Sequence, residues 1–137
     1  MKSGKELTIE WFERVWNSRE RSAISELMCN SCEVKGLNLS ERGPDAFEQF
    51  YDSYCRAFEN IQIEVLEMAE ESELVVGNAQ FRGVHIRSGK DIDILFGFSI
   101  RWKNGKAVDA RNIVDFTTLL IQVGIIGPEV MTSAIQA

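Results

Sequence analysis

The sequence lacks the features that place a chain in a membrane or on nucleic acid. Its longest mostly apolar stretch, residues 119–126, is interrupted by Gln122 and Gly124 and is too short to span a bilayer. The formal net charge is −6, and lysine and arginine form no stripe that could bind phosphate backbones or an anionic membrane. We therefore expect neither nucleic acid nor a membrane among its partners.

Cysteine and histidine are also scarce. The three cysteines are an odd number, and residues 1–20 carry charges but no signal-peptide core, so we expect a cytoplasmic protein. Cys29 and Cys32 form a C-x-x-C pair where a helix should end, whereas redox pairs of this kind open a helix. Zinc would need two more ligands, and only Cys55 and His85 remain. We expect no metal and no cofactor.

Repeats, low-complexity segments and flexible linkers are absent as well. The 137 residues are enough to bury one core without disulfides or a metal. We expect a single domain over residues 1–137, with a core from about 6 to 127 and a tail over 128–137.

The hydrophobic period changes along the chain. Helical spacing predicts helices over residues 5–19 and 22–28, followed by a short strand over 32–37. Gly43-Pro44-Asp45 should open a longer helix, because proline is tolerated in a first turn and an acidic side chain suits that end of the dipole. One face of this helix carries an aromatic stripe: Phe47, Phe50, Tyr51, Tyr54 and Phe58.

After Asn60 the period falls to two. Ile61, Ile63 and Val65 alternate with polar residues as in a strand. Further alternation predicts strands over 74–86, 92–102 and 107–116, and a helical turn is expected at 118–123. Asn104-Gly105 is a strong hairpin signal. Helices followed by hairpin-connected strands indicate an α+β fold, with helices packed on one face of a curved antiparallel sheet.

Three segments in fixed order resemble the SnoaL-like polyketide cyclase family of the nuclear-transport-factor-2-like superfamily. They are WFERVWNSRERSAISELM, GPDAFEQFYDSYCRAF and WKNGKAVDARNIVDFTTLLIQVG, and the likeness covers about residues 6–127. The resemblance implies a cone-shaped sheet wrapped around the long helix, open at one end to a small hydrophobic organic ligand. Candidate ligand-binding residues are Trp16, Phe47, Phe50, Tyr51, Phe81, His85, Phe96, Phe98 and Trp102. Aromatic residues at this spacing are also common as core filling.

The last strand carries the candidate chemistry. Alternation places Asp109, Arg111, Ile113 and Asp115 on one face, which is either wet outer surface or a charged cluster inside the cone. The position of Asp115 resembles that of the family's catalytic acid/base. A single carboxyl could move a proton alpha to a carbonyl and protonate the accepting oxygen, as a cofactor-free cyclase or isomerase requires. Asp115 could instead cap the turn at Thr117-Thr118.

Other functions stay open to different degrees. Steroid isomerase chemistry is excluded by the ungapped count from Asn17, which puts Gly36 and Phe12 where that class carries its base and its tyrosine. Asp109, Arg111 and Asp115 also match the residue types of an epoxide hydrolase. A non-catalytic ligand-binding module is a further alternative. A homodimer could form through outward residues of the sheet, namely Leu74, Val76, Leu95 and Ile113. The tail could then pack on the partner or cover the cone.

Overall fold

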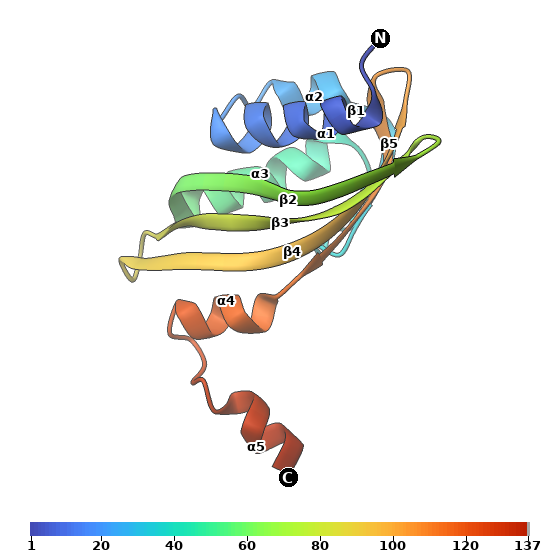
Figure 1. Cartoon of the computed structure of the whole chain (residues 1–137). Coiled ribbons are helices and arrows are strands. Elements are labelled where there is room, and N and C mark those ends of the chain that lie inside the picture. The colour runs from blue at the N-terminus through green and yellow to red at the C-terminus, as the bar shows by residue number, and fades with distance from the viewer. Residues whose placement is uncertain (137) are drawn as a thin grey trace.

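The computed structural model describes residues 1–136 and confirms the α+β fold; residue 137, the end of the expected tail, lies outside the described residues. Helices and strands follow one another along the chain as Figure 1 labels them. The elements are α1 (Gly4–Trp11), the π-helical turn η1 (Phe12–Asn17), α2 (Ala23–Leu27), β1 (Met28–Lys35), α3 (Pro44–Ala57), β2 (Phe58–Glu71), β3 (Leu74–His85), β4 (Lys90–Lys103), β5 (Lys106–Val114), α4 (Phe116–Gln122) and α5 (Val130–Gln136).

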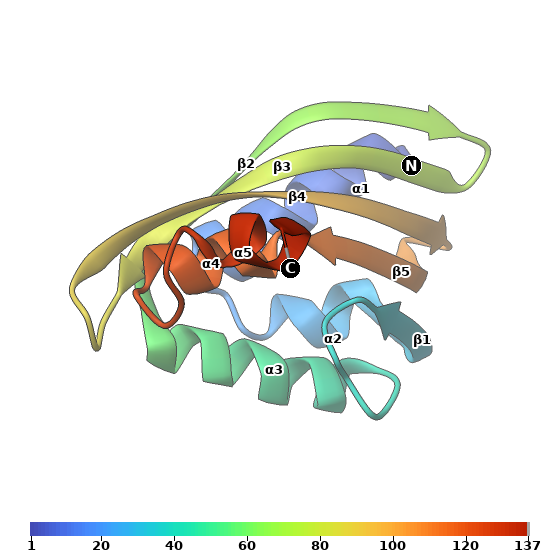
Figure 2. The same cartoon turned by 90° about the horizontal axis from the view of Figure 1, so that it is seen from below.

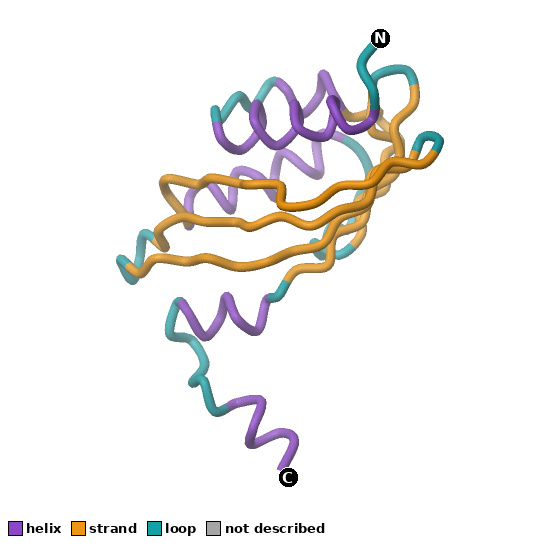
Figure 3. The backbone as a smooth tube through the Cα atoms, viewed as in Figure 1, coloured by secondary structure: helices purple, strands orange, loops and turns teal. Residues whose placement is uncertain are grey.

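The five strands form one sheet in the order β1-β5-β4-β3-β2. β1 runs parallel to β5, and the other neighbours are antiparallel hairpins joined by short turns (Figure 3). Asn104 and Gly105 both have positive φ, at 52° and 77°, as the Asn-Gly hairpin signal predicts. Strand β1 begins at Met28, four residues before the predicted strand, because it pairs with β5 from that point.

The sheet curves over the helices, and its concave face holds the core (Figure 2). Strand β4 alternates strictly, with every second residue from Ile92 to Trp102 buried. Gly77 of β3 lies opposite Phe98 of β4. A Cβ at Gly77 would come within 2.8 Å of the Phe98 ring, so the glycine makes room for that ring.

The first helix changes geometry halfway, which the sequence does not reveal. Ser3 and Glu6 form a capping box that starts α1, and the helix passes into η1 at Phe12. A π-helix bonds residues five apart, so residues five apart lie closer to one face than they do in an α-helix. In an α-helix they would be about 140° apart. The π-helical turn therefore brings Trp11 and Trp16 toward one face.

The segment after β5 binds to the part of β4 that β5 does not cover. Gln122 of α4 donates from Nε2 to the Asp93 carbonyl (2.9 Å) and accepts from the Asp93 N–H (2.8 Å), which covers β4 where β5 has ended. Helix α5 has no buried residue and projects away from the sheet, so it does not cover the cone (Figure 1). Within residues 1–136 no helix has the length and apolar character needed to cross a membrane.

Candidate functional site

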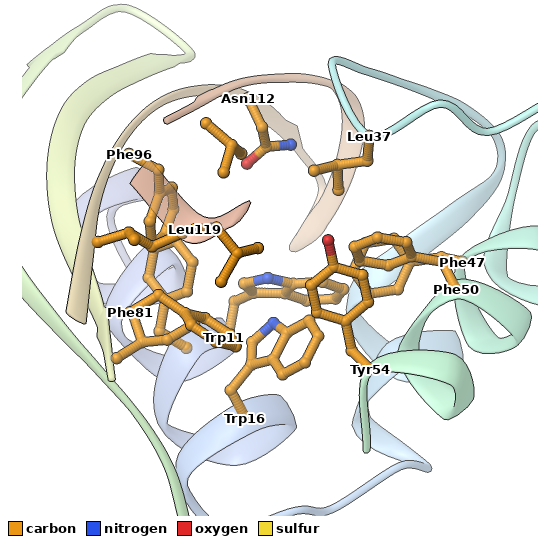
Figure 4. A pocket seen from close by; sticks show the side chains of 14 residues that line it. Trp11, Trp16, Leu37, Phe47, Phe50, Tyr54, Phe81, Phe96, Asn112 and Leu119 are labelled. Atoms are coloured by element: carbon orange, nitrogen blue, oxygen red, sulfur yellow. The ribbon is translucent and has the colours of Figure 1, made fainter. Parts of the chain in front are cut away.

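An apolar pocket of about 70 Å³ lies between the concave face of the sheet, η1 and α3 (Figure 4). Its lining is mainly aromatic and aliphatic: Trp11, Phe12, Trp16, Leu37, Phe47, Phe50, Tyr54, Ile63, Phe81, Ile94, Phe96, Asn112, Val114 and Leu119. Trp16 lies at the centre of the aromatic packing, with its ring centroid 4.9 Å from that of Tyr51 and 6.1 Å from that of Phe81. Such edge and tilted arrangements are favourable between aromatic rings.

Five of the nine expected ligand-binding residues line this pocket: Trp16, Phe47, Phe50, Phe81 and Phe96. The other four lie outside it. Tyr51 donates its buried hydroxyl to the Val15 carbonyl at 2.8 Å. Phe98 packs against Phe12, and Trp102 donates its indole N–H to Thr8 at 3.0 Å. His85 is half-buried at the end of β3.

His85 has a local partner of its own. Its Nδ1 lies 2.7 Å from the Ser88 hydroxyl, and its ring packs beside Phe58. Ser88 also accepts from the Lys90 N–H in the β3–β4 turn. These contacts give the histidine a role in shaping the hairpin.

The pocket is also lined by residues that were not among the expected ligand-binding residues. Tyr54 belongs to the aromatic stripe of α3, so helical spacing could have indicated it. Asn112 lies on the face of β5 opposite the charged one, and strand alternation could have indicated it. Trp11 follows the buried Leu7 at the four-residue spacing of α1, so helical spacing could have indicated it as well.

Four polar groups face the pocket without a hydrogen-bonding partner among residues 1–136. They are the Asn112 amide, the Tyr54 hydroxyl and the indole N–H groups of Trp11 and Trp16. Among the described residues, no fully enclosed side-chain nitrogen or oxygen lacks a partner, so these four groups are open to the pocket. Figure 4 shows the Tyr54 hydroxyl directed toward Asn112. Burial raises the pKa of Tyr54, so its hydroxyl can donate at neutral pH.

The three candidate catalytic residues are not brought to this pocket. Asp115 is exposed and caps α4, where its carboxylate accepts from the Thr118 N–H at 3.0 Å and the Thr118 hydroxyl at 2.5 Å. These bonds lower the pKa of Asp115, which is opposite to the shift expected of a general acid in an apolar site. Arg111 and Asp109 lie on the outer face, since β5 turns Asn112 and Val114 inward. This face of β5 is therefore outer surface and not a charged cluster inside the cone.

The positions that carry steroid isomerase chemistry also lack polar side chains. Phe12 lines the pocket, and Gly36 lies directly against the main chain of Asn112, where a Cβ would be 1.7 Å from the carbonyl oxygen. The φ of Gly36 is 93°, a conformation that favours glycine. This glycine lets the β1–α3 loop approach β5 beside the pocket.

Comparison with known proteins gives a family and a fold. The family model of the SnoaL-like polyketide cyclases matches residues 6–123. IdmH of Streptomyces antibioticus, a candidate polyketide cyclase, is similar in structure with a TM-score of 0.79 and 17% identity, covering 90% of this chain and 99% of that one. AclR of Streptomyces galilaeus, a candidate hydroxylase, has a TM-score of 0.79 and 19% identity, covering 97% and 89%.

A third similar structure is a protein from Catenulispora acidiphila with a ketosteroid isomerase-like fold, in complex with trimethylamine. Its TM-score is 0.76 at 12% identity, covering 87% of this chain and 92% of that one. No curated protein sequence matches the chain. At these identities the solved structures establish the fold alone.

Proposed function

Because the chain belongs to the SnoaL-like polyketide cyclase family, we propose that its pocket binds a small hydrophobic organic molecule that carries a carbonyl oxygen. The observation that supports this is the set of unpaired donors in an otherwise apolar lining. A ligand without an acceptor would displace water from these donors and leave them unpaired, at about 1–3 kcal/mol each, so the lining favours a ligand that carries an acceptor oxygen. A ligand oxygen between Tyr54 and Asn112 would accept from both of these donors.

The same donors favour a cofactor-free cyclase or isomerase as a second candidate function. Donors fixed around a carbonyl stabilise negative charge that develops on its oxygen when an adjacent proton is removed. The described lining contains no carboxylate, and Asp115 would have to leave Thr118 to act as a base. The lining therefore supports binding and polarisation of a carbonyl more directly than proton transfer by Asp115.

The test compares acetophenone with ethylbenzene, which has nearly the same shape but no oxygen. Of the three tryptophans, Trp11 and Trp16 line the pocket and Trp102 does not, so ligand binding should quench tryptophan fluorescence in wild type and in Trp102→Phe alike. Acetophenone should bind at least about tenfold more tightly than ethylbenzene, equivalent to about 1.4 kcal/mol. Equal affinity for both compounds would show that the pocket does not recognise the carbonyl oxygen. If neither compound bound, the proposal as a whole would be refuted.

We also propose a second copy of the chain as a partner on the outer face of the sheet. Val76, Leu95 and Ile113 are 42%, 53% and 80% exposed there. Glu67 on β2 and Arg111 on β5 flank them, so a two-fold axis parallel to the strands would oppose unlike charges. Sedimentation should show a dimer in wild type and a monomer in Ile113→Glu; a monomeric wild type at high protein concentration would exclude this partner.

A further inference from the structure

A second hollow adjoins the pocket and shares one wall with it. This hollow, which we call the vestibule, has a volume of about 540 Å³ and lies between the β1–α3 loop and the outer part of α3. Leu37, Phe50 and Tyr54 line both the pocket and the vestibule. Figure 4 shows these three side chains together along one side of the pocket. Only this wall separates an apolar chamber from a larger hollow with polar edges.

The pocket as it stands is smaller than a ring compound, so a ring can reach the pocket donors only by displacing part of the shared wall. Its volume of about 70 Å³ compares with about 150 Å³ for a cavity that takes up benzene. Sites for drug-sized ligands run from about 300 to 1,000 Å³. The vestibule lies within that range by itself and the pocket does not, so a ligand of such size that reaches the pocket donors must extend past the shared wall into the vestibule.

Among the described residues, the shared wall is held by packing and by no side-chain hydrogen bond. Leu37 follows Gly36 and precedes Asn38, whose φ angles of 93° and 61° form a tight bend in the loop. Leu37 and Phe50 have only apolar side chains, and the Tyr54 hydroxyl has no protein partner among residues 1–136. The rings of Phe50 and Tyr54 lie 4.4 Å apart. Rotation of these side chains would join the two hollows without breaking a side-chain hydrogen bond.

The charges of the vestibule define the part of the ligand that would occupy it. Glu41 and Asp45 line it and have no ion-pair partner among the described residues. Its arginine, Arg42, is paired with Glu33 at 3.0 Å. The uncommitted charge is therefore negative, which favours an arm with amine or hydroxyl donors and disfavours a carboxylate or phosphate arm.

We propose that the ligand is elongated and amphipathic, with an apolar carbonyl-bearing ring in the pocket and a neutral or cationic donor arm in the vestibule. This inference rests on the proposed function, since the same pocket holds the ring. The ligand passes between Leu37 and Phe50, and its arm lies beside Asp45 at the start of α3. Selectivity for the arm then comes from the vestibule, and selectivity for the carbonyl comes from the pocket.

The test uses three probes with the same head: acetophenone, acetophenone with a para-aminopropoxy arm, and acetophenone with a para-carboxypropoxy arm. Calorimetry should show the amine arm raising affinity at least about tenfold over acetophenone, and the carboxylate arm giving no gain. Asp45→Asn should reduce the preference for the amine arm over the carboxylate arm. The inference is overturned if the two arms bind equally well in wild type.

Two matched variants separate this inference from the proposed function. Ala46 lines the vestibule and not the pocket, so Ala46→Phe should abolish the gain from the amine arm and leave acetophenone affinity within about threefold. Arg56→Phe, an exposed change on the same helix outside both hollows, should retain the gain. If Ala46→Phe keeps the full gain, the vestibule is not the arm's site. If acetophenone itself does not bind, the proposed function fails.

Discussion

The two tyrosines of the chain provide a matched pair of hydroxyl deletions on one helix. Tyr51 and Tyr54 both lie on α3 and contact Trp16, with ring centroids 4.9 and 6.5 Å from that of the indole. The Tyr51 hydroxyl is buried and donates to the Val15 carbonyl at 2.8 Å, whereas the Tyr54 hydroxyl faces the pocket without a partner among residues 1–136. Replacement by phenylalanine removes only the hydroxyl in each case.

The two deletions should therefore have opposite consequences. Tyr51→Phe leaves the Val15 carbonyl without its donor and should lower the free energy of unfolding by about 1–2 kcal/mol. Tyr54→Phe breaks no hydrogen bond and should change it by less than about 0.5 kcal/mol. In acetophenone titrations the order reverses, with Tyr54→Phe weakening binding about three- to tenfold and Tyr51→Phe leaving it nearly unchanged.

Urea unfolding followed by circular dichroism measures the stabilities, and fluorescence titration measures the affinities. If Tyr54→Phe proves as destabilising as Tyr51→Phe, the Tyr54 hydroxyl has a structural partner and is not available to a ligand. Unchanged acetophenone affinity in Tyr54→Phe would equally refute its role as a donor.

Three further predictions concern residues around the site. Burial raises the pKa of Cys32 from 9.0 to about 12, so the stability that its protonated thiol contributes is complete below pH 9 and is lost as pH rises toward 12. The unfolding free energy, measured by denaturant unfolding between pH 9 and 12, should therefore depend less on pH in Cys32→Ala than in wild type. Asp115→Ala should lose about 1 kcal/mol of unfolding free energy and Asp115→Asn much less, because asparagine also caps helices. Neither change should alter acetophenone affinity, and a loss of affinity in Asp115→Asn would indicate that the carboxyl belongs to the binding site. Gly77→Ala should destabilise by at least about 1–3 kcal/mol in thermal unfolding, because its Cβ would lie 2.2 Å from the Glu67 carbonyl; a wild-type melting temperature would contradict this packing.

Much of the fold follows from local patterns in the sequence. The Asn104-Gly105 turn, the proline at the start of α3 and the alternation of β4 each specify an element by local chemistry. The order of these elements was sufficient to indicate helices packed on a hairpin sheet. What local patterns could not give is the π-helical turn, since no residue pattern in the segment Phe12–Asn17 marks it.

The candidate site was only partly predictable, for a reason that lies in β5. Strand alternation separates Asp109, Arg111 and Ile113 from Asn112, but it does not say which face is inner. Register across the sheet decides this, and the β4–β5 pairing contains an irregularity between Arg101 and Trp102. The aromatic positions of α3 were more predictable, since Phe47 and Phe50 follow helical spacing. On β4 alternation was not enough, because Phe98 and Trp102 share the buried face with Phe96 and still lie outside the pocket.

The central claim is that donors in the pocket bind a carbonyl oxygen, and the infrared stretching frequency of bound, carbon-13-labelled acetophenone tests it most directly. A hydrogen-bonded carbonyl absorbs at lower frequency than the same group in hydrocarbon solvent. We expect this lowering in the wild-type complex and its partial reversal in Tyr54→Phe and in Asn112→Leu. A bound carbonyl that absorbs as it does in hexane, in wild type and in both variants, would contradict the claim.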